Sequence, residues 1–283
     1  LGNQLFQLSL YLFIKKVLGN NNLFIDRKIG FMFDYKYHRK YELENLPKLI
    51  SFSNYFFSIL NTLILVIKRI NPNIFKLFFI DLIDDKKILL IEKKKHLNRK
   101  FNYQIFDGYF QSFYIVNQVK YDLLKIINPL LNKKNVDFLD LNSRISNEKN
   151  SVALCIRFYE ETIDPNLHAN FNGPKSYKDY NKLIKYFEEK LENPYFFIFV
   201  QEENFFTDQL IFDSSYEFIT HKKGYKGSWE RLNSQSLCIN HIFNNSTFYF
   251  WGAFISQAKN SQKKSMIYMS DNFLFESIYN QEW

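Results

Sequence analysis

Cysteine is scarce in this sequence, since only Cys155 and Cys238 occur among 283 residues. Each lies inside an apolar run, where a thiol behaves as a small hydrophobic side chain. Two isolated cysteines exclude a disulfide framework and do not form a metal site. The low cysteine content favours a reducing compartment, and we expect a cytoplasmic location.

A long uninterrupted hydrophobic run is also missing. The longest apolar stretch, residues 55–67, is broken by polar residues and is shorter than the ~18 to 20 residues that a membrane span needs. We therefore expect a buried helix here. The alternative is a helix that lies against an anionic bilayer, because Lys68 and Arg69 follow it directly and Lys76 comes soon after. That alternative would give a peripheral contact at the inner face of a membrane.

Patterns typical of metal and nucleic-acid binding are absent as well. The sequence contains no Asp-x-Asp motif and no His/Cys cluster with the spacing of metal ligands. Its one short basic block, residues 93–95, is typical of a solvated helix face. The net charge of +8 nevertheless favours acidic partners such as nucleotide phosphates or anionic lipids. We expect no metal, no other cofactor and no nucleic-acid partner.

Length and hydrophobic patterning predict two α/β domains. A chain of 283 residues with 46% hydrophobic and 23% charged residues fits about two globular domains. The second half alternates apolar strands with amphipathic helices, which is the pattern of a Rossmann-like domain with a parallel sheet. Residues 129–150 have the polar composition of a connection, and we place the domain boundary between residues 148 and 149.

The expected elements can be given by residue range. In the first half we expect a helix over 5–17, a short strand at 23–25, the helix at 55–67, a strand-like segment at 88–91 and a strand beginning at 105. In the second half we expect strands at 151–158, 195–200, 216–219, 241–243 and 266–269, with helices over 177–191 and 232–238 and from 246 onward.

Residues 244–254 combine the features of an anion-binding site. Two asparagines precede Ser246 and Thr247, which stand at an expected helix start before an aromatic run. Unpaired N–H groups of the first helical turn, the positive end of the helix dipole and two hydroxyls would together bind a phosphate. The alternative is that Asn245 or Ser246 is an ordinary N-cap of a core helix.

Arg157 is a second candidate ligand for an anion. It stands near the end of the apolar strand at 151–158, and open parallel sheets bind ligands at the carboxyl ends of their strands. A guanidinium in that place suits a bidentate contact with an oxyanion. The alternative is a structural ion pair with Glu160 or Glu161.

Four separated motifs occur in an order that is found in one enzyme family. They are Leu-Gly-Asn-Gln-Leu-Phe-Gln at 1–7, Arg-Lys-Tyr-Glu-Leu at 39–43, Gly-Tyr-Phe-Gln-Ser at 108–112, and Leu-Cys at 237–238 followed by Asn-Ser-Thr-Phe and Trp-Gly-Ala within 245–253. With them the chain resembles, over nearly its whole length, glycosyltransferase family 11, the inverting α-1,2-fucosyltransferases. The family's leading glycines are missing before Leu1, so we expect that further residues precede it. Of the family's His-x-Arg-Arg-Gly-Asp run, this sequence keeps only the first arginine, as Arg157.

The resemblance implies an α/β glycosyltransferase of the GT-B type, with two Rossmann-like domains facing a cleft. It implies an acceptor-side domain over residues 1–148 and a nucleotide-sugar domain over residues 149–283. GDP-fucose would be the donor, bound without a metal, and a hydroxyl of a glycan, lipid-linked or part of a surface polysaccharide precursor, would be the acceptor. The donor-binding residues implied are Gly2, Asn3, Arg157, Asn245, Ser246, Thr247 and Phe248.

Catalysis would then be a direct displacement at the anomeric carbon of the sugar. Arg157 would stabilise the departing nucleoside diphosphate, and Glu160 and Glu161, with Asp164, are the candidates for a base that deprotonates the acceptor. Two alternatives remain open. The chain is a glycosyltransferase of the same scaffold with another nucleotide-sugar donor, or a non-catalytic module that binds a glycan or a nucleotide.

Overall fold

The computed structural model describes two units of the chain. It describes residues 1–19, 22–32, 40–44, 46, 50–70, 80–93, 103–133, 135–158, 176–262, 264–271 and 276–279. The first unit comprises Leu1, Asn3–Ile127 and Ser277–Tyr279, and the second comprises Gly2 and Asn128–Glu276 together with the last four residues. Each unit is described by itself below.

The first unit is mainly helical, with a short parallel pair of strands. Its elements are α1 (Gly2–Leu18), α2 (Ile29–Met32), α3 (Tyr55–Ile70), β1 (Ile80–Asp84), η2 (Asp85–Lys87), α4 (Ile88–Glu92), β2 (Tyr103–Asp107), α5 (Phe113–Gln118), α6 (Lys120–Leu131), which runs into the second unit, and η4 (Glu276–Ile278). Strands β1 and β2 pair in register from Ile80 opposite Tyr103 to Asp84 opposite Asp107. Apolar side chains of α1, including Phe13, pack with Ile83 of β1 and with α4 and α5 in one core cluster.

The helix expected at 5–17 and the strand expected from residue 105 are confirmed by α1 and β2. The strand-like prediction at 88–91 is wrong, because these residues form helix α4. Ile88 and Ile91 are buried while Leu89 is 56% exposed, which is the spacing of a helix. Four consecutive apolar residues do not distinguish the two structures. Of the strand expected at 23–25, only an isolated bridge between Ile25 and Phe52 forms.

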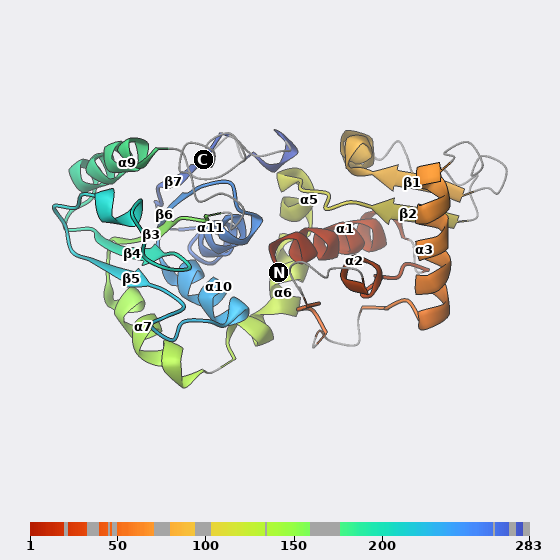
Figure 1. Ribbon diagram of the computed structural model, residues 1–283, viewed down its shortest axis with the longest axis horizontal. Helices are drawn as coiled ribbons and strands as arrows, with labels where there is room; N and C mark the ends of the chain where they lie inside the picture. Colours follow the sequence, from red (N-terminus) through yellow and green to blue (C-terminus); the bar gives the residue numbers. More distant parts are fainter. Residues whose placement is uncertain are drawn as a thin grey trace. The chain divides into compact units, whose positions relative to one another are not determined.

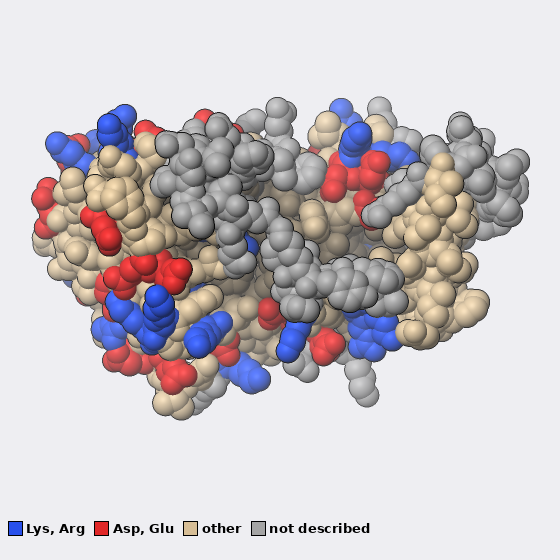
Figure 2. Space-filling model, in the orientation of Figure 1, with Lys and Arg blue, Asp and Glu red and all other residues tan. Residues whose placement is uncertain are grey.

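Helix α3 confirms the helix expected at 55–67, but the prediction that it is buried is wrong. Phe56, Leu63 and Ile70 are 69%, 54% and 79% exposed. The space-filling view shows α3, orange in Figure 1, as a band of uncharged tan atoms (Figure 2). Within the described part of the chain, none of the helices combines the length and the apolar character that crossing a membrane requires.

The second unit contains a five-stranded parallel sheet. Its elements are α7 (Val136–Asn147), β3 (Ser151–Cys155), α9 (Tyr177–Lys190), β4 (Tyr195–Phe199), η3 (Thr207–Gln209), β5 (Tyr216–Ile219), α10 (Ser228–Leu237), β6 (Asn240–Phe243), α11 (Thr247–Lys259) and β7 (Ile267–Met269). The strand order is β5-β4-β3-β6-β7, and all neighbouring strands are parallel. The predicted strands and the predicted α/β character of this half are confirmed, and the parallel sheet is compatible with the predicted Rossmann-like domain.

Helices cover both faces of this sheet. Tyr180, Ile184 and Phe187 of α9 pack on one face, against alternate residues of β3, β4 and β6. Helices α7, α10 and α11 lie on the other side of the sheet (Figure 1). Residues of β3 are buried throughout, as expected for a central strand that is covered on both faces. Cys155 and Cys238 are buried free thiols, which confirms that they behave as small core residues.

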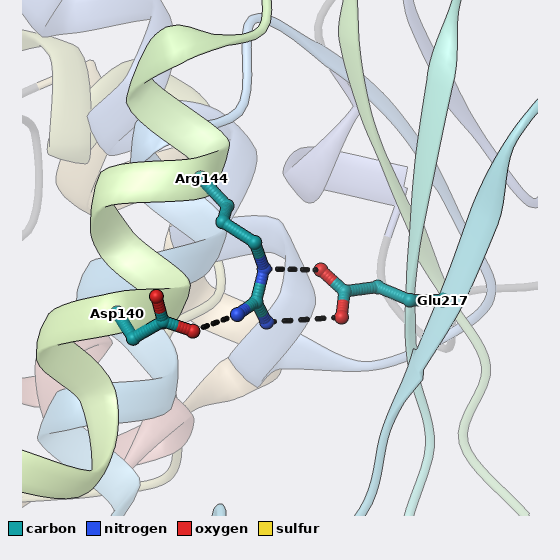
Figure 3. A network of polar contacts seen from close by, with 3 residues as sticks. All are labelled: Asp140, Arg144 and Glu217. Atoms are coloured by element: carbon teal, nitrogen blue, oxygen red, sulfur yellow. Dashed lines mark hydrogen bonds and ion pairs between the residues drawn. The ribbon is translucent and has the colours of Figure 1, made fainter.

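Helix α7 belongs to the second unit, although the expected domain boundary between residues 148 and 149 places it in the first. It packs on α10, and Ser234 donates a hydrogen bond to Asn142 at 2.6 Å. Arg144 of α7 donates two hydrogen bonds to the carboxylate of Glu217 on β5, from Nε at 3.3 Å and from Nη2 at 3.0 Å (Figure 3). It also forms an ion pair with Asp140, one turn away on α7. The polar composition that suggests a connection in the sequence is instead the solvent side and ion-pairing side of a packed helix.

His241 makes the stability of the second unit depend on pH. It is 1% exposed on β6, with Nε2 3.1 Å from the carbonyl oxygen of Cys238. Burial lowers the pKa of His241 to about 4, below its value of 6.5 in an unfolded chain. Between these two values the unfolded chain binds the proton and the folded one does not, so stability is full above pH 6.5 and falls toward pH 4.

We expect the free energy of unfolding to fall by roughly 3 kcal/mol over this pH window, and His241→Phe to remove most of that dependence. Urea unfolding of both proteins between pH 7 and pH 4 measures it. Parallel pH profiles for the two proteins would show that the imidazole is not the group responsible.

Candidate functional site

The strand order of the second unit defines where a ligand can bind. The chain runs from β3 outward through β4 to β5, then returns to the other side of β3 as β6 and continues to β7. The direction of winding therefore changes between β3 and β6. In open parallel sheets, ligands bind in the crevice outside the carboxyl ends of the strands at this switch point. Here those ends lead into Arg157 and into Asn244.

Asn244 joins the two strand ends. Its side-chain oxygen accepts a hydrogen bond from the backbone N–H of Arg157 at 2.9 Å, and its side-chain N–H donates to the carbonyl of Arg157, also at 2.9 Å. Asn244 is only 1% exposed, whereas the side chain of Arg157 is exposed. These two hydrogen bonds, called the Asn244 clasp below, fix the backbone of Arg157 at the switch point. The exposed Arg157 side chain extends from this fixed backbone.

Helix α11 begins directly after this clasp. Asn245 and Ser246 are buried, and Thr247 and Phe248 are half-buried. Ser246 is the N-cap, in an extended conformation, and its hydroxyl accepts no capping hydrogen bond from the first turn. The caps of α5, α7 and α9 differ, because each accepts such a bond. The sequence-predicted residues 245–248 and Arg157 are thus brought to the carboxyl ends of two adjacent strands.

Gly2 belongs to the second unit, where it packs on the first turn of α11. Its carbonyl accepts a hydrogen bond from the indole N–H of Trp251 at 2.9 Å. A Cβ at this position would lie 2.6 Å from both Thr247 Oγ1 and Phe248 N. This close approach requires a glycine for reasons of packing, independently of any ligand.

The other predicted residues lie in the first unit or outside the described residues. Asn3 lies in the first unit, where its side-chain oxygen accepts a hydrogen bond from Gln111 at 3.2 Å. Glu160, Glu161 and Asp164 lie outside the described residues.

Two buried side chains that the sequence does not single out hold the same edge of the sheet. The hydroxyl of Tyr249 lies 3.2 and 3.3 Å from the carbonyl oxygens of Ile156 and Phe199. Burial raises the pKa of Tyr249 to about 12, although Arg231 and Arg157 act in the opposite direction. The phenol is therefore neutral and can donate.

Arg231 is the more unusual of the two, since it is 5% exposed. Its guanidinium donates to the carbonyls of Val200, Ile219 and Tyr225 at 3.1, 3.2 and 2.9 Å. Burial lowers the pKa of Arg231, but an arginine stays charged in proteins. A buried cation thus lies at the ends of β4 and β5, near Tyr249. The sequence signal for it is weak: one charged residue on the side of α10 that also carries Leu232 and Gln235.

A pocket of about 270 Å³ adjoins the carboxyl ends of β6 and β7. It is lined by Asp179, Tyr180, Leu183, Ile242, Phe243, Tyr268, Met269, Ser270 and Asp271. Its walls are mainly apolar and aromatic, with two carboxylates, two phenols and a serine hydroxyl among them. Such a surface suits a flat ring that carries hydrogen-bonding groups.

Metal-binding clusters are not found in the described ranges, where no three His, Cys, Asp or Glu side chains come together in a way that could hold an ion. Comparisons with protein-family models, with curated proteins and with solved structures found no match to this chain. The family resemblance therefore depends on the sequence motifs alone.

Arg231→Met should destabilise the second unit by about 3 kcal/mol, because carbonyls at the ends of two strands would lose a charged donor in a buried place. Urea unfolding monitored by circular dichroism measures the loss. Arg144→Met is the matched control, since that arginine is 40% exposed and should cost about 1 kcal/mol or less. Equal losses for the two variants would contradict the role given to Arg231.

Proposed function

We propose that the second unit binds the diphosphate of a nucleotide sugar at the switch point between β3 and β6. One observation carries this proposal: Arg157 and the start of α11 follow the two strands on either side of that point, joined by the Asn244 clasp. An exposed guanidinium and a helix N-terminus whose N-cap hydroxyl makes no capping hydrogen bond are both suited to an anion.

Charge compensation in this site would come from the protein. Arg157 would contact the phosphates directly, while the N-terminal dipole of α11 and the buried Arg231 would add a positive potential behind them. These groups would do what a divalent ion does in metal-dependent enzymes. The pocket that includes Phe243 and Asp271 would accept the nucleobase, because it begins at the end of β6, next to the clasp.

The reaction we propose is transfer of fucose from GDP-fucose to a glycan hydroxyl with inversion. The acceptor oxygen would form a bond to the anomeric carbon while the bond from that carbon to the phosphate oxygen breaks. The departing diphosphate would keep the electron pair, and Arg157 would stabilise its growing negative charge. Glu160 or Glu161 would take the acceptor proton. The GT-B arrangement, with the first unit on the acceptor side, is part of this proposal.

A binding module without catalysis is the second candidate. It is favoured by the run Cys155-Ile156-Arg157-Phe158-Tyr159-Glu160, in which one arginine remains of the family's charged motif. Such a module would use the same phosphate contacts and would not transfer the sugar. A different nucleotide-sugar donor would also fit these contacts, since the diphosphate is common to all such donors.

Arg157→Ala should weaken binding of GDP and GDP-fucose by about 100-fold and reduce sugar transfer by at least as much, with unchanged thermal unfolding. Arg157→Lys keeps the charge but not the bidentate geometry, and should recover only part of the binding. Isothermal titration and donor turnover measure the two effects. Lys190→Ala is the control, because this cation lies at the end of α9, just before the amino end of β4.

Unchanged affinity in Arg157→Ala would refute the phosphate site. Affinity that falls in the variant, with no hydrolysis or transfer by the unaltered protein on any glycan acceptor, would favour the binding module. Preference for another nucleotide sugar over GDP-fucose in the same titration would reassign the donor while keeping the site.

A further inference from the structure

Helix α3 exposes its apolar side to solvent, unlike an ordinary surface helix. A helix on a globular protein normally turns its apolar stripe to the core and its polar side to water. In α3 the polar side chains of Ser58 and Asn61 bond to the protein, whereas most of the large apolar side chains are exposed. This arrangement is costly in water, so it calls for a second apolar phase or partner on the outside.

The inner side of α3 is bonded to the first unit through polar groups. Tyr103 of β2 donates a hydrogen bond to the side-chain oxygen of Asn61 at 2.9 Å, and the Asn61 amide is 3.5 Å from a carboxylate oxygen of Asp26. Ser58 is 1% exposed and shares a hydrogen bond with Ser53 at 3.1 Å. These hydrogen bonds fix the rotation of the helix about its axis, and they thereby determine which side chains of α3 are exposed.

The outward face is long and apolar. Its exposed side chains extend from the first turn to the last, with the large ones at helical spacing. They are Tyr55, Phe56, Phe57, Ile59, Leu60, Leu63, Val66, Ile67 and Ile70. The helix has 16 residues, too few to cross a bilayer but enough to lie in the plane of its interface.

Positive charge lies at the start of this face. The guanidinium of Arg27 lies 5.4 Å from the ring centre of Phe52, and the ammonium of Lys28 lies 4.3 Å from that of Tyr55, both at the start of α3. At the other end the sequence continues with Lys68 and Arg69. The sequence has no Asp or Glu from residue 45 to residue 80.

The carboxylate of Asp26, near the start of α3, is bonded on the inner side of the helix. Burial raises the pKa of Asp26, but hydrogen bonds from the N–H groups of Lys28 and Ile29 and from Ser58 and Ser53 outweigh this, and the pKa is lowered. The group is therefore charged and turned to the polar side of the helix. The start of the apolar face is therefore left with the cations Arg27 and Lys28.

We propose that α3 is a docking surface for an anionic lipid bilayer, in which its outward side chains enter the interface and the flanking cations meet lipid phosphates. A second copy of the chain fits less well. A two-fold interface would place the same cations of both copies together, whereas anionic head groups neutralise them. Tyrosine at the edge of the face, with one polar end, also suits the head-group layer. This proposal does not depend on the proposed sugar transfer.

The test uses the full chain and vesicles made of phosphatidylcholine with or without phosphatidylglycerol. The altered protein carries Phe56→Gln, Leu63→Gln and Ile67→Gln, at positions 69%, 54% and 38% exposed. The matched control carries Val136→Gln, Leu139→Gln and Ile211→Gln, three exposed apolar residues of the second unit at 82%, 49% and 68%. Circular dichroism and thermal unfolding establish that both variants fold.

We expect the unaltered protein to sediment with the anionic vesicles, to bind neutral vesicles more weakly, and to lose binding as salt is raised. The α3 variant should lose about 100-fold in partitioning, and the control should be unchanged. Absence of binding to anionic vesicles, or equal binding by the α3 variant, would overturn the proposal. So would self-association without vesicle binding that the α3 substitutions abolish, because a second copy would then be the occupant of this face.

Discussion

The parallel pairing of β3 with β6 is the constraint on which the second unit depends. It places Cys155 opposite Phe243, so the chain leaves both strands at the same level of the sheet. Asn244 can then bond both backbone groups of Arg157 with one side chain. A register shift of one residue would separate these groups and move each side chain to the opposite face of the sheet. The site and the core of this unit are therefore specified by the same hydrogen-bond ladder.

The sequence predicts most of this unit because its strands have an unambiguous composition. Residues 151–156 are apolar except for one serine, and such runs are buried on both faces of a parallel sheet. Short apolar runs outside that context are ambiguous, which is why the strand prediction at 88–91 fails where helix α4 forms. The helix at 55–67 is predicted correctly, but its burial is not. Hydrophobicity predicts that a side chain leaves water, without saying whether it enters the protein core or another apolar phase.

The candidate site is predictable only in part. Arg157 and Ser246 can be placed because they follow strands, and the carboxyl ends of parallel strands meet at one edge. Arg231 cannot, because its role comes from carbonyls of β4 and β5 that meet only in the folded sheet. Gly2 illustrates a different limit. A glycine before a helix indicates a close approach, but only the structure shows that the approaching group is the first turn of α11.

The two buried thiols of the second unit can report on its local unfolding, because each becomes reactive only when the structure around it opens. Cys155 lies on the central strand and Cys238 at the end of α10, and burial raises the pKa of each thiol above its usual value. Both therefore stay protonated and out of reach of alkylating reagents while the sheet is closed. The rate at which each thiol is alkylated would follow the rate or the extent of opening around it. Unequal alkylation rates for Cys155 and Cys238 would reveal whether the structure opens first around strand β3 or around the end of helix α10.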